Sequence, residues 1–280
     1  MLEKLKLDGP PRRVAIVTGG SRGLGKAMAI SLAEAGADVC IASRTEAQLE
    51  SAAVEIEAAC GRRPLTIPTN VQDSAQCDAL IAKTVAHFGR LDIMMNNAGI
   101  GDRRGGGTHL WDLADADWHD TIEVNLHSTF YCSRAASRHF LAQNEGGVIV
   151  NVSSGTAQRG SPQSFAYAAA KAGVISLTKS MAAMLVGENI RVNCIVPGFV
   201  LQSPPKDDQA RQAAASRGRF NPAQRLGEAW ELGPLAVFLC SEASSYITGE
   251  SFTIDGGGLT GGISPAGYTP TFDFGGASNG

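Results

Sequence analysis

Tyr167 and Lys171 are the two residues whose types and spacing most directly suggest chemistry. Three alanines separate them, so on a helix the phenol and the ammonium group lie on one face. A nearby cation favours tyrosinate and lowers the pKa of a phenol from its ordinary value of about 10. Such a phenol can give a proton to a carbonyl oxygen or, in reverse, take one from an alcohol. The same spacing arises by chance on many helices, so the pair needs support from other residues.

A glycine-rich segment at residues 18–25 directly follows an apolar run and leads into an expected helix. There, the pyrophosphate of a dinucleotide can lie against backbone N–H groups at the helix N-terminus. Glycine is required because a Cβ would block that approach. A turn that merely packs a strand on a helix is the alternative, which the strand–turn–helix context disfavours. The cofactor-binding residues predicted in this segment are Gly19, Ser21, Arg22, Gly23, Leu24 and Gly25.

The end of the second expected strand carries Ser43 and Arg44 and no carboxylate. NAD sites usually place Asp or Glu about 20 residues past the glycine loop, where it binds the ribose hydroxyls. Arg44, helped by Arg22 and the Ser43 hydroxyl, can instead pair with a 2′-phosphate. We therefore expect NADP(H) as the preferred cofactor and NAD(H) as the second choice. The alternative is that both arginines are simply solvated at helix starts.

The elements that must position these residues follow a strand–helix alternation. Apolar runs that suit buried parallel strands occupy residues 14–17, 39–42, 65–67, 93–95, 148–152 and 192–196. Amphipathic segments predict helices over residues 25–35, 47–58, 75–88, 118–140, 164–186 and 228–240. Such repetition predicts an α/β fold, a doubly wound Rossmann-type domain with a mainly parallel sheet of about seven strands and helices on both faces.

No linker or repeat divides the chain, so residues 1–280 are expected to form a single domain, with an N-terminal extension at 1–11 and a glycine-rich tail at 258–280. Thr45 and Gln48 suggest a capping box for the second helix, and Gly36 and Gly61 stand where helices should end. Residues 101–107, rich in glycine and arginine, are expected to form a loop.

Composition excludes several classes of function. The chain is 44% hydrophobic and 18% charged with a formal net charge of −3, which suits a packed enzyme and lacks the basic footprint of nucleic-acid or anionic-membrane binding. Its six cysteines form no C-x-x-C pair and its histidines no H-E-x-x-H motif, so neither disulfides nor a metal site are expected. The N-terminus has no apolar run for a signal peptide or membrane span. A cytoplasmic location is expected.

Taken together, the motifs resemble the short-chain dehydrogenase/reductase family over about residues 12–257. The resemblance rests on T-G-x-x-x-G-x-G at 18–25, N-N-A-G at 96–99, Asn125, Ser154 before Y-x-x-x-K at 167–171, Pro197-Gly198 after a strand, and I-T-G at 247–249 before I-D-G-G at 254–257.

This resemblance implies catalytic roles for four residues. Tyr167 would be the acid/base, and Ser154 would hydrogen-bond the substrate oxygen and its developing charge. Spacing and strand alternation favour Ser154 over Ser153. Lys171 would hold the nicotinamide ribose and lower the pKa of the tyrosine, and Asn125 would position a water as a proton relay. The cofactor itself would supply the hydride.

The resemblance also extends the cofactor site, with two departures. The further residues implied are Asn70, Val71, Asn97, Ala98, Gly99, Pro197, Gly198 and Val200, beside Tyr167 and Lys171. Relatives often carry Asp where this chain has Asn70, whose amide can still bond the adenine edge. The threonine that many relatives use on the nicotinamide amide is missing after Gly198, and Gln202 or Ser203 are candidate replacements.

Substrate specificity is expected from variable loops, with Gln158 and Phe199 joining Ser154 and Tyr167 in a mostly apolar pocket. Relatives that reduce acyl-carrier-protein thioesters tend to present arginines where this chain has Glu145 and Glu188. An acyl carrier protein is therefore unexpected as a partner, because acidic side chains would repel it.

The expected activity is interconversion of a small-molecule carbonyl, a ketone or a 3-oxoacyl thioester, and a secondary alcohol. An NAD-dependent secondary alcohol or sugar/polyol dehydrogenase remains an alternative within enzymes. A non-catalytic dinucleotide-binding regulatory protein and a structural subunit of a hetero-oligomer are the alternatives outside them. By resemblance, a homotetramer or homodimer would form through the helices expected at 118–140 and 164–186.

Overall fold

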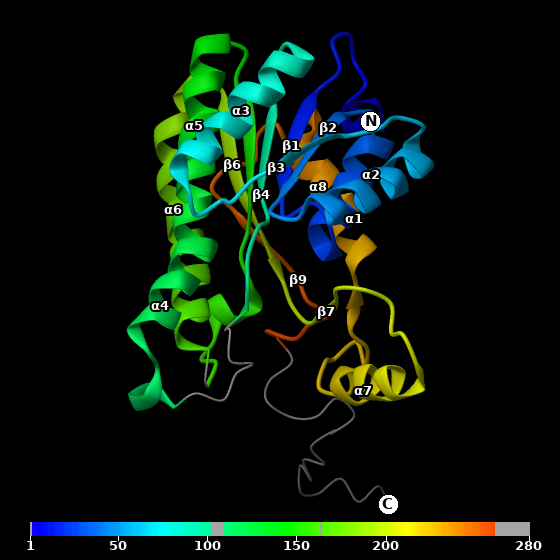
Figure 1. Cartoon of the computed structure of the whole chain (residues 1–280), viewed down its shortest axis with the longest axis vertical. Helices are drawn as coiled ribbons and strands as arrows, with labels where there is room; N and C mark the ends of the chain where they lie inside the picture. Colours follow the sequence, from blue (N-terminus) through cyan, green and yellow to red (C-terminus); the bar gives the residue numbers. More distant parts are fainter. Residues whose placement is uncertain (1, 102–108, 163, 261–280) are drawn as a thin grey trace, which may run out of the picture.

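Seven parallel strands form the centre of the molecule (Figure 1). The computed structural model describes residues 2–101, 109–162 and 164–260. The sheet has the order β3-β2-β1-β4-β5-β6-β9, and every neighbouring pair is parallel. Its strands are β1 (Val14–Thr18), β2 (Asp38–Ser43), β3 (Leu65–Pro68), β4 (Ile93–Asn96), β5 (Gly147–Val152), β6 (Ile190–Pro197) and β9 (Ser251–Ile254). The predicted fold class is confirmed.

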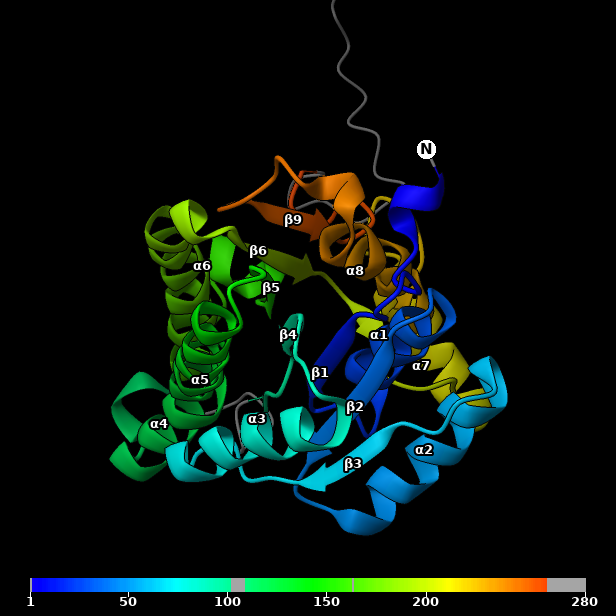
Figure 2. The same cartoon turned by 90° about the horizontal axis from the view of Figure 1, so that it is seen from above.

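Helices cover both faces of this sheet, as Figure 2 shows from above. Those on one face are α1 (Gly23–Glu34), α2 (Glu46–Cys60) and α8 (Gly233–Cys240). Those on the other face are α3 (Ser74–Phe88), α5 (Ser128–Gln143) and α6 (Phe165–Leu185). Two more helices, α4 (Asp115–Ile122) and α7 (Asp208–Gly218), lie toward the end of the molecule where the strands terminate (Figure 1).

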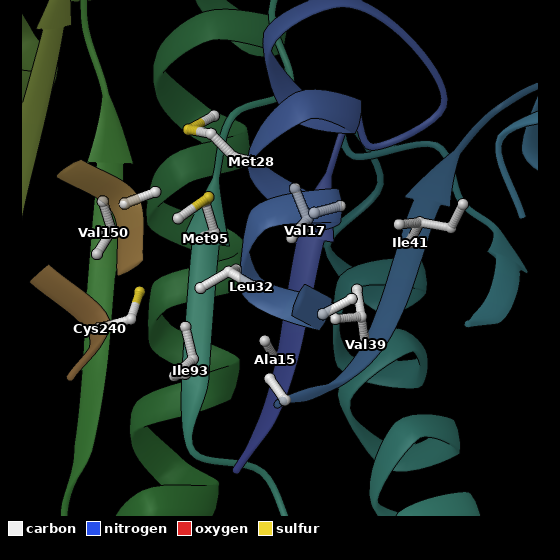
Figure 3. Packing of buried hydrophobic residues seen from close by; sticks show 14 of the residues in the cluster. Ala15, Val17, Met28, Leu32, Val39, Ile41, Ile93, Met95, Val150 and Cys240 are labelled. Carbon is white, nitrogen blue, oxygen red and sulfur yellow. The ribbon is translucent and has the colours of Figure 1, made fainter. Parts of the chain in front are cut away.

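Alternation along the strands divides the core in two. Ala15 and Val17 of β1 pack toward the α1 face, whereas Val14 and Ile16 pack toward the α3 face. Figure 3 shows Leu32 of α1 on the first side, among residues of β1, β2 and β4. Full burial of one such side chain stabilises the fold by about 1.5 to 3 kcal/mol. The near-continuous apolar strands are therefore those of a sheet covered on both faces.

Short elements join the layers. They are the 3₁₀ turns η1 (Leu2–Leu5), η2 (Leu110–Asp112), η4 (Gly155–Gln158), η5 (Val186–Glu188), η6 (Ala229–Leu232) and η7 (Glu242–Ser244), the π-helical turn η3 (Glu123–His127), and a two-stranded parallel sheet of β7 (Val200–Leu201) and β8 (Gly227–Glu228). The sequence did not predict β7, β8 or α7.

Several local predictions need correction. The helix predicted over residues 118–140 is α4, η3 and α5 in succession, and the last helix begins at Gly233 behind a separate 3₁₀ turn. Thr45 precedes α2 but its side chain makes no capping hydrogen bond, so the capping box is absent. Gly61 does end α2 with a φ of 72°, and Gly36 follows the C-cap residue Ala35 of α1 with a φ of 108°, so both glycines stand where helices end. The loop predicted at 101–107 and the tail lie largely outside the described residues.

The order of the strands locates the functional edge. Successive strands run outward from β1 to β2 and β3 in one direction and to β4, β5 and β6 in the other. The connections after β1 and β4 therefore leave the sheet on opposite sides and open a crevice at its carboxyl edge. In open α/β sheets this switch point is where ligands bind.

Candidate active site

The glycine-rich loop has the geometry that its composition predicts. It links β1 to α1, and Gly19 and Gly23 adopt left-handed φ values of 65° and 56°. A Cβ on Gly25 would overlap the carbonyl oxygen of Gly19, so no larger residue fits there. The loop thus delivers backbone N–H groups to the N-terminus of a helix of 12 residues, an arrangement that fits a pyrophosphate.

Asn97 and Thr18 brace this loop from the other side of the crevice. The Asn97 side-chain amide donates to the carbonyl oxygens of Thr18 and Gly19 at 3.0 and 3.3 Å. The Thr18 hydroxyl accepts from the N–H groups of Asn97 and Ala98, both at 3.1 Å. The side-chain amide of Asn97 is therefore engaged by the loop backbone, so Asn97, which the resemblance implies as a cofactor-binding residue, braces the loop.

The residues expected near the adenosine ribose gather beyond β2. Arg22 and Arg44 are exposed, and neither forms an ion pair with a described residue. The Ser43 hydroxyl is buried and has no hydrogen-bond partner among the described residues. Val71 is buried, and the Asn70 side chain accepts from the N–H of Gln72. The guanidinium groups of Arg22 and Arg44 and the hydroxyl of Ser43 are therefore suited to bind a phosphorylated ribose.

Tyr167 and Lys171 lie one turn apart on α6, as the spacing predicts. The Lys171 Nζ is 5.8 Å from the centroid of the Tyr167 ring and donates to the carbonyl oxygen of Val152 at 2.9 Å. Lys171 is only 3% exposed, whereas Tyr167 is half-buried. Burial lowers the pKa of Lys171 to about 8, while the neighbouring Cys194 acts weakly in the opposite direction. The ammonium group is therefore held next to the phenol at a large desolvation cost.

The two serines at the end of β5 have different surroundings. Ser153 is buried, and its hydroxyl donates to the backbone carbonyl of Lys171 at 2.7 Å. Ser154 is half-buried, and its hydroxyl oxygen accepts from the N–H and the hydroxyl of Thr156 at 3.3 and 3.1 Å. Ser153 thus ties α6 to the sheet, whereas the hydroxyl of Ser154 is the more accessible of the two.

Asn125 explains why the helix predicted over 118–140 is interrupted. It is fully buried in the π-helical turn η3, and its side-chain nitrogen donates to the carbonyl oxygens of Ile100 and Thr121, both at 2.9 Å. Its side-chain oxygen accepts from the N–H of Ile100 at 3.2 Å. These bonds tie the segment after β4 to the helix, and π-turns of this kind often occur at functional sites.

Gly99 is the point where two of the predicted catalytic side chains meet. A Cβ placed on it would lie 2.8 Å from the Asn125 side-chain oxygen and 3.3 Å from the Lys171 Nζ. Only glycine leaves room there for both groups. The structure therefore brings Asn125, Lys171 and Gly99 together, although they come from different parts of the chain.

The other wall of the crevice is formed by the segment after β6. Gly155 packs against this segment, since its Cβ position is 3.6 Å from the carbonyl oxygen of Pro197 and 3.9 Å from the Cα of Gly198. Phe199 follows and is 43% exposed, and Gln158 is exposed as well. The predicted substrate residues thus line an open rim beside Ser154.

Gln202 and two arginines complete this rim. A Cβ on Gly23 would overlap the side-chain oxygen of Gln202, so the candidate replacement for the missing threonine lies against the glycine loop. Sequence reasoning missed Arg159 and Arg217, whose guanidinium groups lie near the Phe199 ring. No local sequence pattern predicts their position. For Arg217 the reason is that α7, the helix that carries it, has almost no apolar stripe.

The helix α6 is long and apolar enough to cross a membrane by length and composition. It packs instead along β6 and η4 and carries Tyr167 and Lys171 toward the crevice. About a third of its apolar stretch is buried, which is the part that faces the sheet.

Comparisons with known proteins agree with this geometry. The family model described as enoyl-(acyl carrier protein) reductase matches residues 19–258. Fold and site define a Rossmann-type oxidoreductase, and the chain belongs to the short-chain dehydrogenase/reductase family. It is thus an NAD(P)-dependent enzyme acting on CH–OH groups.

Relatives with different substrates are about equally similar to the chain. It is 36% identical over 261 residues to 2-dehydro-3-deoxy-D-gluconate 5-dehydrogenase from Escherichia coli, covering 92% of this chain and 99% of that protein. It is 37% identical over 257 residues to 3-oxoacyl-[acyl-carrier-protein] reductase from Thermotoga maritima, covering 90% and 99%. The crystal structure of a short-chain type dehydrogenase/reductase from Mycobacterium marinum superimposes with a TM-score of 0.83 at 32% identity, covering 92% and 98%.

Proposed function

We propose that the chain is an NADP(H)-preferring oxidoreductase that interconverts the carbonyl group of a small molecule and a secondary alcohol. The observation that carries the proposal is the buried Lys171 ammonium beside the Tyr167 ring, at the switch point of the sheet. Burial disfavours the charged form of Lys171, so keeping a lysine at this position costs stability and points to a functional role.

Proton transfer is assigned to Tyr167. A bound NAD(P)H would supply the hydride for the carbonyl carbon, and the Tyr167 hydroxyl gives its proton to the carbonyl oxygen. Ser154 donates a hydrogen bond to the same oxygen, where negative charge develops. Lys171 favours the tyrosinate that remains and binds the nicotinamide ribose. In the reverse direction the tyrosinate takes the proton from the alcohol.

Asn125 is proposed to place the water that reprotonates the site. Its side-chain nitrogen is engaged by two carbonyl oxygens, and its oxygen accepts one hydrogen bond. An amide oxygen has two lone pairs, so one acceptor position remains for a water. That oxygen lies close to Gly99, as does the Lys171 Nζ, which makes a relay from Lys171 through this water geometrically short.

Preference for NADP(H) is supported by charge beyond β2. Arg44 and Arg22 have no carboxylate partner among the described residues, and Asp or Glu is missing from the position that would bind ribose hydroxyls. A 2′-phosphate would satisfy both guanidinium groups. An NAD-dependent alcohol or sugar/polyol dehydrogenase is the alternative that the cofactor measurement below decides.

A free small molecule is proposed as the substrate in preference to an acyl-carrier-protein thioester. Glu188 is exposed and would repel an acidic carrier. Glu145 contributes less to this argument than the sequence suggests, because Arg90 pairs with it at 2.7 Å. Since the Escherichia coli relative is named for a sugar acid and the Thermotoga maritima relative for a carrier-bound thioester, both classes belong in the test.

A homotetramer or homodimer is proposed, with α5 and α6 at the interface. These helices and η3 border a shallow, mostly apolar trough of about 550 Å³. Phe130 is 43% exposed at its edge, which is costly in a monomer but suited to a helix-on-helix contact between copies. Light scattering on the eluting protein gives its mass, and a monomer at micromolar concentration would refute this assembly.

Initial rates of NADPH and NADH oxidation test the reaction and the cofactor. The substrate panel comprises ketones, diketones, keto sugars, oxo acids, acyl-CoA thioesters and a 3-oxoacyl carrier-protein thioester, with Tyr167→Phe beside the parent. Preferential use of NADPH, abolished in Tyr167→Phe, supports the proposal. Faster use of NADH refutes the role of Arg44 and leaves the chemistry intact. Cofactor binding without turnover of any carbonyl would favour a regulatory dinucleotide-binding protein.

A further inference from the structure

Two arginines from distant segments converge on one aromatic ring at the substrate rim. The guanidinium carbon of Arg159 lies 5.3 Å from the centroid of the Phe199 ring, and that of Arg217 lies 5.6 Å from it. The two carbons are therefore at most about 11 Å apart. Arg159 follows η4, Arg217 occupies the last turn of α7, and Phe199 follows β6. We refer to Arg159 and Arg217 as the arginine pair.

Within residues 2–101, 109–162 and 164–260 the arginine pair has no acidic partner. This contrasts with arginines nearby, since Arg211 on the same helix pairs with Asp208, and Arg225 pairs with Glu231. Both side chains are exposed, so the arginine pair presents two positive charges at this rim that attract an anionic ligand. Guanidinium groups are also suited to bind a carboxylate through two parallel hydrogen bonds.

The position of the arginine pair connects it to the reacting groups. Arg159 comes five residues after Ser154, at the far end of η4. Gly155, next to Ser154, packs on Pro197 and Gly198, from which the chain continues directly to Phe199. The ring that holds both arginines is thus attached to the same corner of the sheet as the serine. The arginine pair therefore belongs to the same end of the sheet as Ser154.

We propose that the arginine pair binds the carboxylate of the substrate, so that the enzyme acts on oxo acids and the corresponding hydroxy acids. This inference depends on the function proposed above, because it assigns the substrate of the same site. Phe199 serves as the support that orients both guanidinium groups, which explains an exposed aromatic residue at that position. The carboxylate takes no part in the chemical step and fixes which end of the substrate reaches Tyr167.

Matched pairs of substrates separate this role from catalysis. The pairs are 5-keto-D-gluconate with L-sorbose, which carries a hydroxymethyl group in place of the carboxylate, and levulinate with methyl levulinate. With the parent and NADPH, kcat/KM for the acids should exceed that for the neutral partners by about tenfold or more. Arg159→Gln and Arg217→Gln should each lower kcat/KM for the acids about tenfold, and the double variant about 100-fold, with the neutral partners changed less than about twofold.

Arg211→Gln is the matched control, because it removes an arginine from the same helix that is already paired with Asp208. Arg211→Gln should leave kcat/KM unchanged for both the acid and the neutral substrate of each matched pair. Equal kcat/KM values for acid and neutral partners with the parent would overturn the inference and leave the proposed function standing. An equal fall in kcat/KM for both partners in the double variant would have the same meaning.

Binding decides the case in which none of these ketones is reduced. The melting temperature of the NADPH-loaded parent should rise with 5-keto-D-gluconate and not with L-sorbose, and the rise should vanish in the double variant. That result would support carboxylate binding by the arginine pair even if the proposed reaction is wrong. Absence of any rise with the acid overturns the inference.

Discussion

The proposed cofactor side and the proposed substrate side of the crevice are built in different ways. The cofactor side consists of backbone groups between β1 and α1, held by partly buried hydrogen bonds that Asn97 donates to Thr18. The substrate side consists of exposed side chains, among them Phe199, Arg159 and Gln158, carried by segments far apart in the sequence. A site that must hold the same cofactor in every relative needs fixed backbone, whereas a site that distinguishes substrates needs side chains that substitution can exchange.

Tyr167 lies between the two sides, and its loss should have the largest effect. Tyr167→Phe removes the hydroxyl that transfers the proton, so kcat should fall about 10³-fold for every substrate, acidic or neutral. Binding of NADPH, followed by its fluorescence, should stay the same. A fall confined to one class of substrate would place the tyrosine on the substrate side and contradict its role as acid/base.

Lys171→Met should lower kcat about 10²-fold and raise stability near neutral pH. The folded pKa of about 8 lies below the ordinary value of 10.5, so between these values the unfolded chain binds more protons and stability rises with pH. Below pH 8 the cost of burying the charge is fully present, on the order of 3 kcal/mol. Loss of the hydrogen bond to Val152 offsets about 1 kcal/mol of the gain.

Urea unfolding at a series of pH values measures this trade-off. The advantage of Lys171→Met over the parent should be greatest at and below pH 7 and should shrink between pH 8 and 10.5. An advantage that does not change with pH would mean that Lys171 is not the group that titrates.

Arg44→Asp tests the cofactor side alone. The introduced carboxylate repels a 2′-phosphate and accepts from ribose hydroxyls, so the ratio of kcat/KM for NADPH to that for NADH should fall about 10- to 100-fold. The ratio between acid and neutral substrates should not move. Arg63→Gln is the control, because this exposed arginine near the end of α2 is already paired with Glu50 and Glu57.

Asn97→Ala should have the smallest effect on the reaction. It removes two hydrogen bonds to the glycine loop, which should cost about 1 to 2 kcal/mol of stability and raise the KM for NADPH several-fold, with kcat nearly unchanged. Thermal unfolding and steady-state kinetics measure the two quantities. A large fall in kcat with KM unchanged would show that Asn97 acts on the chemistry and not on the loop.

The sequence predicted the glycine loop and the helix that follows it, and the reason is local. A glycine at a left-handed φ, a strand before it and a helix after it are determined by neighbours in the chain, so the loop at residues 18–25 is recognisable without a structure. The pair Tyr167 and Lys171 is equally local, because one helical turn fixes its geometry. The parallel sheet with helices on both faces follows from the alternation of strands and helices, whereas the order of its strands was not predicted.

What the sequence did not reveal depends on contacts between distant segments. The π-helical turn at Asn125 arises because its side chain bonds the backbone of Ile100, a contact that helix periodicity does not encode. The bracing role of Asn97 is of the same kind. Arg217 lies on α7, a short polar helix with no apolar stripe, so neither the helix nor its approach to Phe199 was predictable. The capping box predicted at Thr45 is absent from the structure, which shows that suitable residue types allow a capping hydrogen bond but do not ensure it.

The contact between Gln202 and Gly23 links the two sides of the crevice and has a consequence for the order of events in turnover. The Gln202 side chain lies against the glycine loop, and Phe199 is only three residues away. A dinucleotide bound on this loop would displace Gln202 and so shift the segment that carries Phe199. The kinetics should be those of a compulsory-order mechanism, with the dinucleotide first on and last off.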